Sequence, residues 1–132
     1  MKKILLNLIA IGFLFSCTNN DTENPDNELI GNWKLIEVLI DEGGGNGTFA
    51  SVDSQKIITF ESDGTLTSNG SLCNLSISSD GQTSGSYSAS ELTFNSPDCI
   101  NADFNYTFQQ NGNILIIFYP CIEPCQAKYI KE

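Results

Sequence analysis

Short segments with a period of two, separated by turn residues, run from residue 29 to the end of the chain. Residues 54–61, for example, place Lys56, Ile58 and Phe60 on one face and residues 57, 59 and 61 on the other. Alternation of this kind is typical of β-strands, and no stretch of this region sustains the helical period. We therefore expect an all-β fold.

Turn signals divide this region into eight expected strands. Turns such as Ser62-Asp63-Gly64 and Asn111-Gly112 contain glycine, which adopts positive φ without strain. Short consecutive connections give an antiparallel meander, and eight strands can close a small up-and-down barrel. The expected strands are residues 29–40, 54–61, 65–73, 85–90, 91–95, 104–109, 114–119 and 126–131, with a glycine-rich loop at 41–52 and a polar connection at 75–81.

The first expected strand carries the only tryptophan of the chain, Trp33. At the start of a barrel strand, its indole can fill the closed end of the barrel. Gly31, two residues earlier, lets another backbone come close because it has no side chain.

Residues 1–16 have the features of a signal peptide. Lys2 and Lys3 precede a nearly apolar run of 12 residues, 4–15, whereas a spanning helix needs about 20. The sequence Leu14-Phe15-Ser16-Cys17 resembles the lipobox of bacterial lipoproteins. The resemblance implies cleavage before Cys17 and attachment of palmitate or a similar acyl chain to it; an ordinary secretory signal is the alternative.

Residues 17–28 are expected to form a lipidated, flexible tether. Residues 18–28 hold no apolar side chain beyond Pro25, so they cannot bury surface to offset the entropy of ordering. The expected location is the cell envelope, with the chain anchored in the outer membrane at its periplasmic face or at the cell surface. Residues 29–132 then form one barrel domain, which we expect to be a monomer.

The mature chain is strongly acidic. The whole chain of 132 residues has a formal charge of −10, and removal of Lys2 and Lys3 leaves four lysines against sixteen acidic residues, a charge of −12. A polyanion repels nucleic acids and anionic lipid surfaces. We therefore expect no nucleic-acid partner, and we expect membrane attachment to depend on the acyl chain on Cys17.

Two segments resemble a known family. Residues 31–35, Gly-Asn-Trp-Lys-Leu, are similar to the Gly-x-Trp signature of lipocalins, and residues 57–65 are similar to the second strand and turn of the bacterial lipocalin-like domain. Gly85-Ser86-Tyr87 and the closing strands extend the likeness over residues 29–132. The resemblance implies a lipocalin-like barrel with an open mouth; another small lipoprotein β-fold is the alternative.

Four cysteines remain after Cys17, and export places them in an oxidising compartment where an even number predicts disulfides. Because successive strands alternate direction, all four are expected at one rim of the barrel. Three pairings are possible, and we favour Cys73–Cys99 with Cys121–Cys125. A zinc site made of the four thiolates is the alternative, although only residues 121 and 125 have a spacing that zinc sites use.

The chain lacks histidine, so it cannot assemble the usual Ser–His or Cys–His nucleophile. The adjacent Asp41 and Glu42 could act as a carboxylate pair, but a solvated turn is the simpler interpretation. The chain also lacks the calcium-binding loop pattern. We therefore expect no enzymatic activity, no metal and no cofactor.

Two functions remain open. The barrel could bind a small apolar or amphipathic ligand. Alternatively, it could be a protein-interaction or structural module of the envelope, with a packed core and a stapled rim at residues 120–125 that docks a protein or envelope partner. The candidate ligand-binding residues are Trp33, Phe60, Phe94, Tyr106, Phe108, Phe118 and Tyr129.

Overall fold

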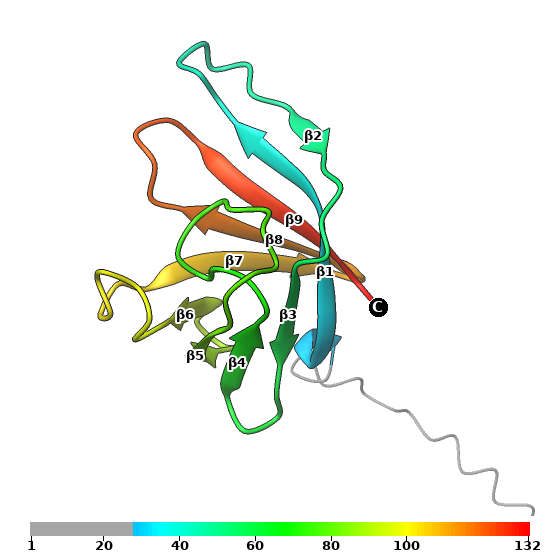
Figure 1. Ribbon diagram of the computed structural model, residues 1–132, viewed down its shortest axis with the longest axis vertical. Helices are drawn as coiled ribbons and strands as arrows, with labels where there is room; N and C mark the ends of the chain where they lie inside the picture. The colour runs from blue at the N-terminus through cyan, green and yellow to red at the C-terminus, as the bar shows by residue number, and fades with distance from the viewer. Residues whose placement is uncertain (1–27) are drawn as a thin grey trace, which may run out of the picture.

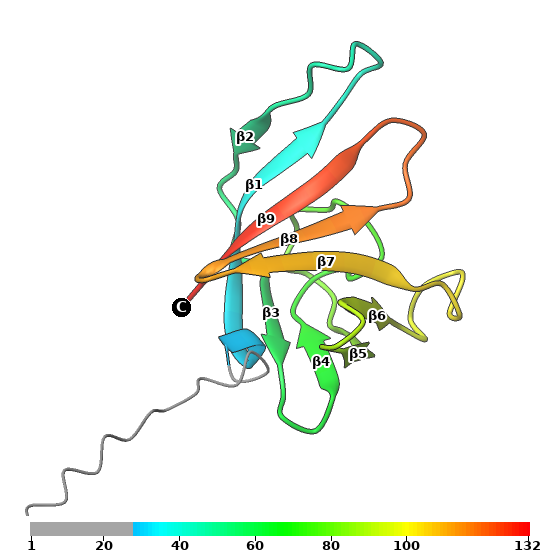
Figure 2. The ribbon, with the colours of Figure 1, turned by 180° about the vertical axis from the view of Figure 1, so that it is seen from behind.

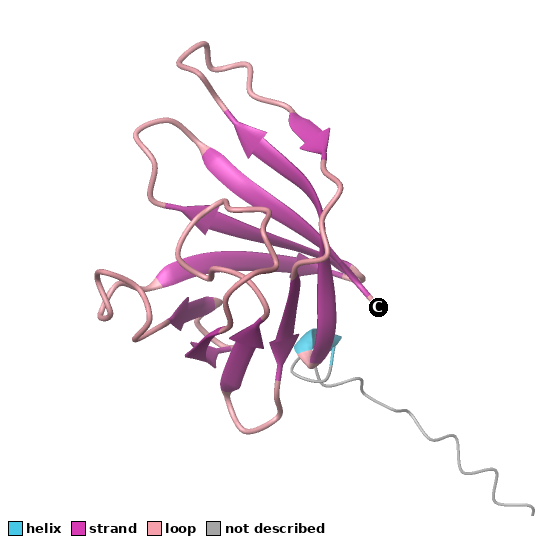
Figure 3. Cartoon of the chain, in the orientation of Figure 1, coloured by secondary structure: helices cyan, strands magenta, loops and turns pink. Residues whose placement is uncertain are grey.

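The structure is a computed structural model that describes residues 28–132. The expected signal peptide, Cys17 and most of the tether lie outside the described residues. The described part of the chain is all-β apart from a helical turn at Glu28 and Leu29 (Figure 3). Its strands are β1 (Gly31–Ile40), β2 (Phe49–Ser51), β3 (Ile57–Phe60), β4 (Thr65–Ser68), β5 (Thr83–Ser88), β6 (Thr93–Asn95), β7 (Tyr106–Asn111), β8 (Ile114–Tyr119) and β9 (Cys125–Lys131).

The strands form a closed antiparallel barrel (Figures 1 and 2). Neighbours in the sheet follow chain order from β3 to β9, and β9 pairs with β1 to complete the ring. The first residues of β1 pair with β3, whereas its last residues pair with the short β2. All strands except β2 therefore make up the ring, which confirms the expected eight-stranded, up-and-down, lipocalin-like barrel.

Two segments differ from the sequence-based expectation. The loop expected at 41–52 contains β2, and the strand expected at 65–73 ends at Ser68. Residues 69–82 instead form a long connection, which we call the lid (Figure 1). The lid is attached to the barrel by Leu72, which is fully buried in the core.

The end of the barrel that holds Trp33, which we call the closed end, is filled as the sequence predicted. Trp33 is fully buried, and its Nε1–H donates a hydrogen bond to the carbonyl of Leu29 at 2.8 Å. Lys131 Nζ lies 5.6 Å from the centre of the indole and donates to the carbonyl of Glu28. Gly31 has φ +126°, a conformation that strongly favours glycine.

The opposite end, which we call the rim, is formed by four loops. They are residues 41–48 between β1 and β2, the lid, residues 96–105 between β6 and β7, and residues 120–124 between β8 and β9. These loops lie at the opposite side of the molecule from the point where the described chain begins (Figures 1 and 2). Because successive strands run in opposite directions, the long loops fall at one end of the barrel and the tight turns at the other.

Candidate functional site at the barrel rim

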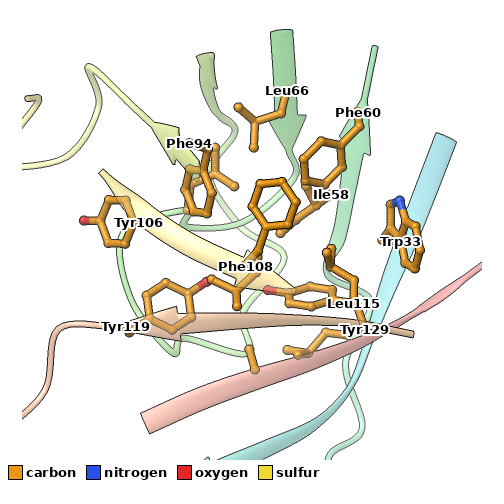
Figure 4. Packing of buried hydrophobic residues seen from close by; sticks show 14 of the residues in the cluster. Trp33, Ile58, Phe60, Leu66, Phe94, Tyr106, Phe108, Leu115, Tyr119 and Tyr129 are labelled. Atoms are coloured by element: carbon orange, nitrogen blue, oxygen red, sulfur yellow. The ribbon is translucent and has the colours of Figure 1, made fainter. Parts of the chain in front are cut away.

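Six of the seven candidate ligand-binding residues lie inside the barrel. The six buried side chains are Trp33, Phe60, Phe94, Tyr106, Phe108 and Tyr129 (Figure 4). Phe118 is a correction, because β8 points Leu115, Ile117 and Tyr119 inward, and Phe118 therefore lies on the outer wall.

The buried rings are packed against one another. Phe60 and Phe108 meet edge to face with centroids 5.6 Å apart, and Phe94 stacks on Tyr106 at 5.0 Å. Tyr106 in turn meets Tyr119 edge to face at 5.9 Å. These spacings are those of aromatic pairs in a protein core. The rings that could have lined a ligand site thus contact each other across the interior.

Two phenol groups inside the barrel have unusual surroundings. The hydroxyl oxygens of Tyr119 and Tyr129 are buried, point toward one another beside Phe108 (Figure 4), and lack a hydrogen-bond partner of normal geometry within residues 28–132. Burial raises the pKa of both hydroxyls, and the weak interaction between the two phenols lowers the pKa of Tyr119 and raises that of Tyr129. Buried polar groups normally have hydrogen-bond partners, so these two hydroxyls are an exception in an otherwise apolar core.

Lys56 is the second polar feature of the interior. Its side chain shares the inward face with Ile58 and Phe60, and only 1% of the residue is exposed. Nζ donates to the carbonyl of Ser76 in the lid at 3.0 Å, and within the described chain no carboxylate lies at ion-pair distance. Burial lowers the pKa of Lys56 to about 8, because a low-dielectric environment disfavours the ammonium ion.

Several contacts hold the lid over Lys56. Ser54 Oγ donates to the carbonyl of Ile77 at 2.7 Å, and Thr83 Oγ1 donates to the carbonyl of Gly70 at 2.7 Å. A Cβ at position 70 would lie 3.1 Å from the Lys56 stem and 2.3 Å from the Ser78 carbonyl. Glycine is required there chiefly because the lid folds back so closely on its own backbone at Ser78, and the lysine stem adds to the crowding.

The four cysteines pair as the sequence analysis favoured. Cys73 in the lid is bonded to Cys99 in the loop between β6 and β7, with Cα atoms 5.4 Å apart. Cys121 and Cys125 enclose the tight loop between β8 and β9. With all four sulfurs in disulfides, the zinc alternative has no free thiolates. No cluster of metal-binding side chains occurs elsewhere in residues 28–132.

The glycine-rich loop at the rim is organised by one carboxylate. Asp41 Oδ1 accepts N–H groups from Gly43 and Gly44 at 3.0 Å and from Gly45 at 3.2 Å, while Oδ2 accepts that of Gly47 at 3.3 Å. Burial alone would raise the pKa of Asp41, but these four donors outweigh it and lower the pKa. Both carboxylate oxygens of Asp41 are therefore engaged in holding the loop.

The loop at 41–48 and the stapled loop at 120–124 form one continuous corner of the rim. Ile40 pairs with Cys125 across the sheet, and the Asp41 N–H donates to the Pro124 carbonyl at 3.1 Å. A Cβ at position 43 would lie 3.8 Å from Glu123 Oε1. We call residues 40–47 and 120–125 the stapled corner.

Exposed apolar side chains gather at the rim. Ile100 and Ile122 are completely exposed, and Ile40 and Ile77 are exposed as well. All four lie in the rim loops or at the strand end next to them, whereas the other large exposed apolar side chain of the described residues, Leu92, lies in the β5–β6 turn at the closed end. The sequence analysis singled out the stapled loop but not the other three isoleucines, because their exposure depends on the fold.

The fold and the site define a class of protein: a small closed β-barrel of lipocalin-like architecture, with a packed aromatic core and a rim held by two disulfides. Comparison with models of protein families, with curated proteins and with solved structures finds no match to this chain. Within the described residues, no helix has the length and apolar character needed to cross a membrane.

Proposed function

We propose that this chain is a lipid-anchored lipoprotein of the cell envelope whose barrel is a non-enzymatic module that docks a protein partner through its rim. The observation that carries this proposal is the set of exposed isoleucines on disulfide-held loops, with Ile122 and Ile100 completely exposed. Exposure of an aliphatic side chain to water is unfavourable, and exposed apolar surface commonly marks an interaction site. Loops that are already rigid lose little entropy on binding.

The proposed anchor orients this surface. The described chain begins at the closed end with Glu28, and the ten residues 18–27 separate it from Cys17. An acyl chain on Cys17 would place the closed end nearer to the outer membrane and the rim farther from it. This arrangement favours a partner that approaches from the aqueous side.

A small ligand inside the barrel is the second candidate. The unpaired hydroxyls of Tyr119 and Tyr129 favour it, because a polar group between them would complete their hydrogen bonds. The mutual ring contacts of Phe60, Phe94 and Phe108 oppose it, since an apolar ligand would have to displace them.

Site-specific photocrosslinking tests the docking proposal. A photoreactive amino acid replaces Ile122 in the full-length, membrane-attached protein, and a second protein carries it at the exposed closed-end position of Leu92. We expect a discrete crosslinked species, identified by mass spectrometry, from position 122 and not from position 92. Equal crosslinking at both positions, or none at position 122, contradicts the proposal.

A further inference from the structure

We infer that the stapled corner recognises a protein segment that combines basic and aliphatic side chains. This inference rests on the proposed function and specifies the chemistry of its partner. The main observation behind it is that Ile122 is completely exposed in the loop closed by Cys121 and Cys125. Ile40, also exposed, is the last residue of β1, directly before the adjoining loop.

The corner is rigid before any partner arrives. The disulfide closes the loop at 120–124, the four N–H donors to Asp41 fix the neighbouring glycines, and the Asp41 N–H to Pro124 hydrogen bond joins the two loops. Ile122 is thus held in solvent by covalent and hydrogen-bonded geometry. Such a side chain is suited to insert into an apolar depression on a partner.

The charge around Ile122 selects a basic partner. Glu42 and Glu123 are exposed in the corner, whereas the carboxylate of Asp41 is occupied by backbone donors. Among the described lysines, none lies in a rim loop, Lys128 is paired with Glu37, and Lys56 is buried. All charged side chains of the four rim loops are therefore acidic, and lysine or arginine on the partner would complement them.

Two other occupants fit the corner less well. An anionic membrane would be repelled by the acidic rim, so only a neutral lipid surface could receive the isoleucines. A metal ion is a poor candidate, because the described residues contain no group of three or more His, Cys, Asp or Glu side chains that could hold one.

Binding of defined peptides tests this inference. A short fluorescein-labelled peptide of lysine, leucine and glycine is titrated with the mature protein at physiological salt, with fluorescence anisotropy as the readout. Two matched probes replace either the lysines by glutamate or the leucines by serine. We expect saturable binding of the first probe and at least about tenfold weaker binding of either matched probe.

Matched variants locate the binding. Ile122→Ser and the double variant Glu42→Gln with Glu123→Gln should each weaken binding of the lysine–leucine probe about tenfold. Leu92→Ser and the double variant Glu61→Gln with Glu91→Gln make equivalent changes at exposed closed-end positions and should change it less than twofold. Equal effects of the two sets would mean general attraction to a polyanion and would overturn the inference.

Three further outcomes separate this inference from the proposed function. Rim-dependent binding to vesicles of phosphatidylcholine, without binding to the peptide, would make lipid the occupant and overturn it. If position 122 crosslinks to an identified protein but the lysine–leucine probe does not bind, rim docking stands and the basic chemistry of the partner is wrong. If position 122 crosslinks to nothing, the proposed function itself fails.

Discussion

Lys56 occupies a position in which its charge destabilises the fold. The lid covers the Lys56 side chain, only 1% of the residue is exposed, and the described partner of its ammonium group is one carbonyl of the lid. A buried cation without a counter-ion loses hydration that a single neutral acceptor does not replace. This loss of hydration lowers the pKa of Lys56 to about 8 and so shifts its protonation equilibrium toward the neutral amine.

We predict a characteristic dependence of stability on pH from this residue. In the unfolded chain Lys56 has a pKa near 10.5, above the folded value of about 8, so the unfolded state binds more protons between these values. The free energy of unfolding should therefore rise with pH from about 8 toward 10.5. Above about pH 10 it should fall again, because Tyr119 and Tyr129 can ionise readily only after unfolding.

The variant Lys56→Met tests this assignment. It should be about 1–3 kcal/mol more stable than the natural chain at pH 7, since the charge is removed and the stem volume is kept. The rise between pH 8 and 10 should disappear in the variant. Urea unfolding at several pH values measures both effects; an unchanged slope in the variant would show that another group causes the rise.

The two buried tyrosines lead to a second prediction at this scale. Tyr129→Phe should be neutral or up to about 1 kcal/mol stabilising, because it removes a buried hydroxyl whose interaction with the Tyr119 phenol falls short of a normal hydrogen bond. Tyr87→Phe is the matched control, since its hydroxyl donates to the Glu61 carbonyl at 2.6 Å, and it should cost about 1 kcal/mol. Both values come from thermal or urea unfolding. A clear loss of stability in Tyr129→Phe would instead indicate a water molecule or ligand bound between the phenols.

The sequence contained the signal for Lys56 but not for Tyr119. The alternation of residues 54–61 already placed Lys56 on the same face as Ile58 and Phe60. Residues 114–119 are apolar at both odd and even positions, so alternation alone does not show which side chains point inward. The sequence therefore favours Phe118 for the interior, whereas the structure places Tyr119 there. Only pairing with β7 and β9 fixes which face of β8 points inward.

At the scale of elements, the lid is the part that the sequence described least well. Its serine- and asparagine-rich composition predicted a polar connection only for residues 75–81, because the segment before it reads as a weak strand. That segment leaves the sheet after Ser68, and Leu72 enters the core instead. The strand β2 was missed because its three residues follow a glycine-rich loop and form a strand only by pairing with β1.

The Cys73–Cys99 disulfide should contribute more to stability than Cys121–Cys125. The first joins residues 26 apart and the second joins residues 4 apart. In the chain-entropy model these loops correspond to about 3.5 and about 2 kcal/mol. The double variants Cys73→Ser with Cys99→Ser, and Cys121→Ser with Cys125→Ser, should lose stability in this order.

Hydrogen exchange distinguishes the roles of the two disulfides. Loss of Cys73–Cys99 should accelerate exchange of amides in the lid, because the lid is then attached only by hydrogen bonds and by the apolar contacts of Leu72 and Leu75. Loss of Cys121–Cys125 should leave the lid protected and accelerate exchange in the stapled corner. Equal lid protection in both double variants would show that the disulfide does not restrain the lid.

At the scale of the whole molecule, the direction of the strands determines what each end can do. Odd and even members of the eight-stranded ring run in opposite directions, so one end collects tight turns and the other collects the long loops and all four cysteines of the barrel. This separation could be predicted from the sequence, because it depends only on strand count and connection length. The packing of the rings could not, because it depends on the register around the ring.

The proposed anchor completes this arrangement, and it gives the last prediction. If Cys17 carries acyl chains, the natural protein should sediment with outer membranes, resist extraction by salt and incorporate labelled palmitate. Salt resistance is expected because the acidic barrel has no electrostatic attraction to anionic lipid, so attachment depends on acyl burial.

The variant Cys17→Ser tests the anchor. It should abolish labelling and leave the protein in the inner membrane with an uncleaved signal peptide or in the soluble fraction. The fold of residues 28–132, followed by circular dichroism, should stay the same. A natural protein that is soluble, with a mature mass showing cleavage elsewhere than before Cys17, would contradict the anchor and leave the rim free to face any direction.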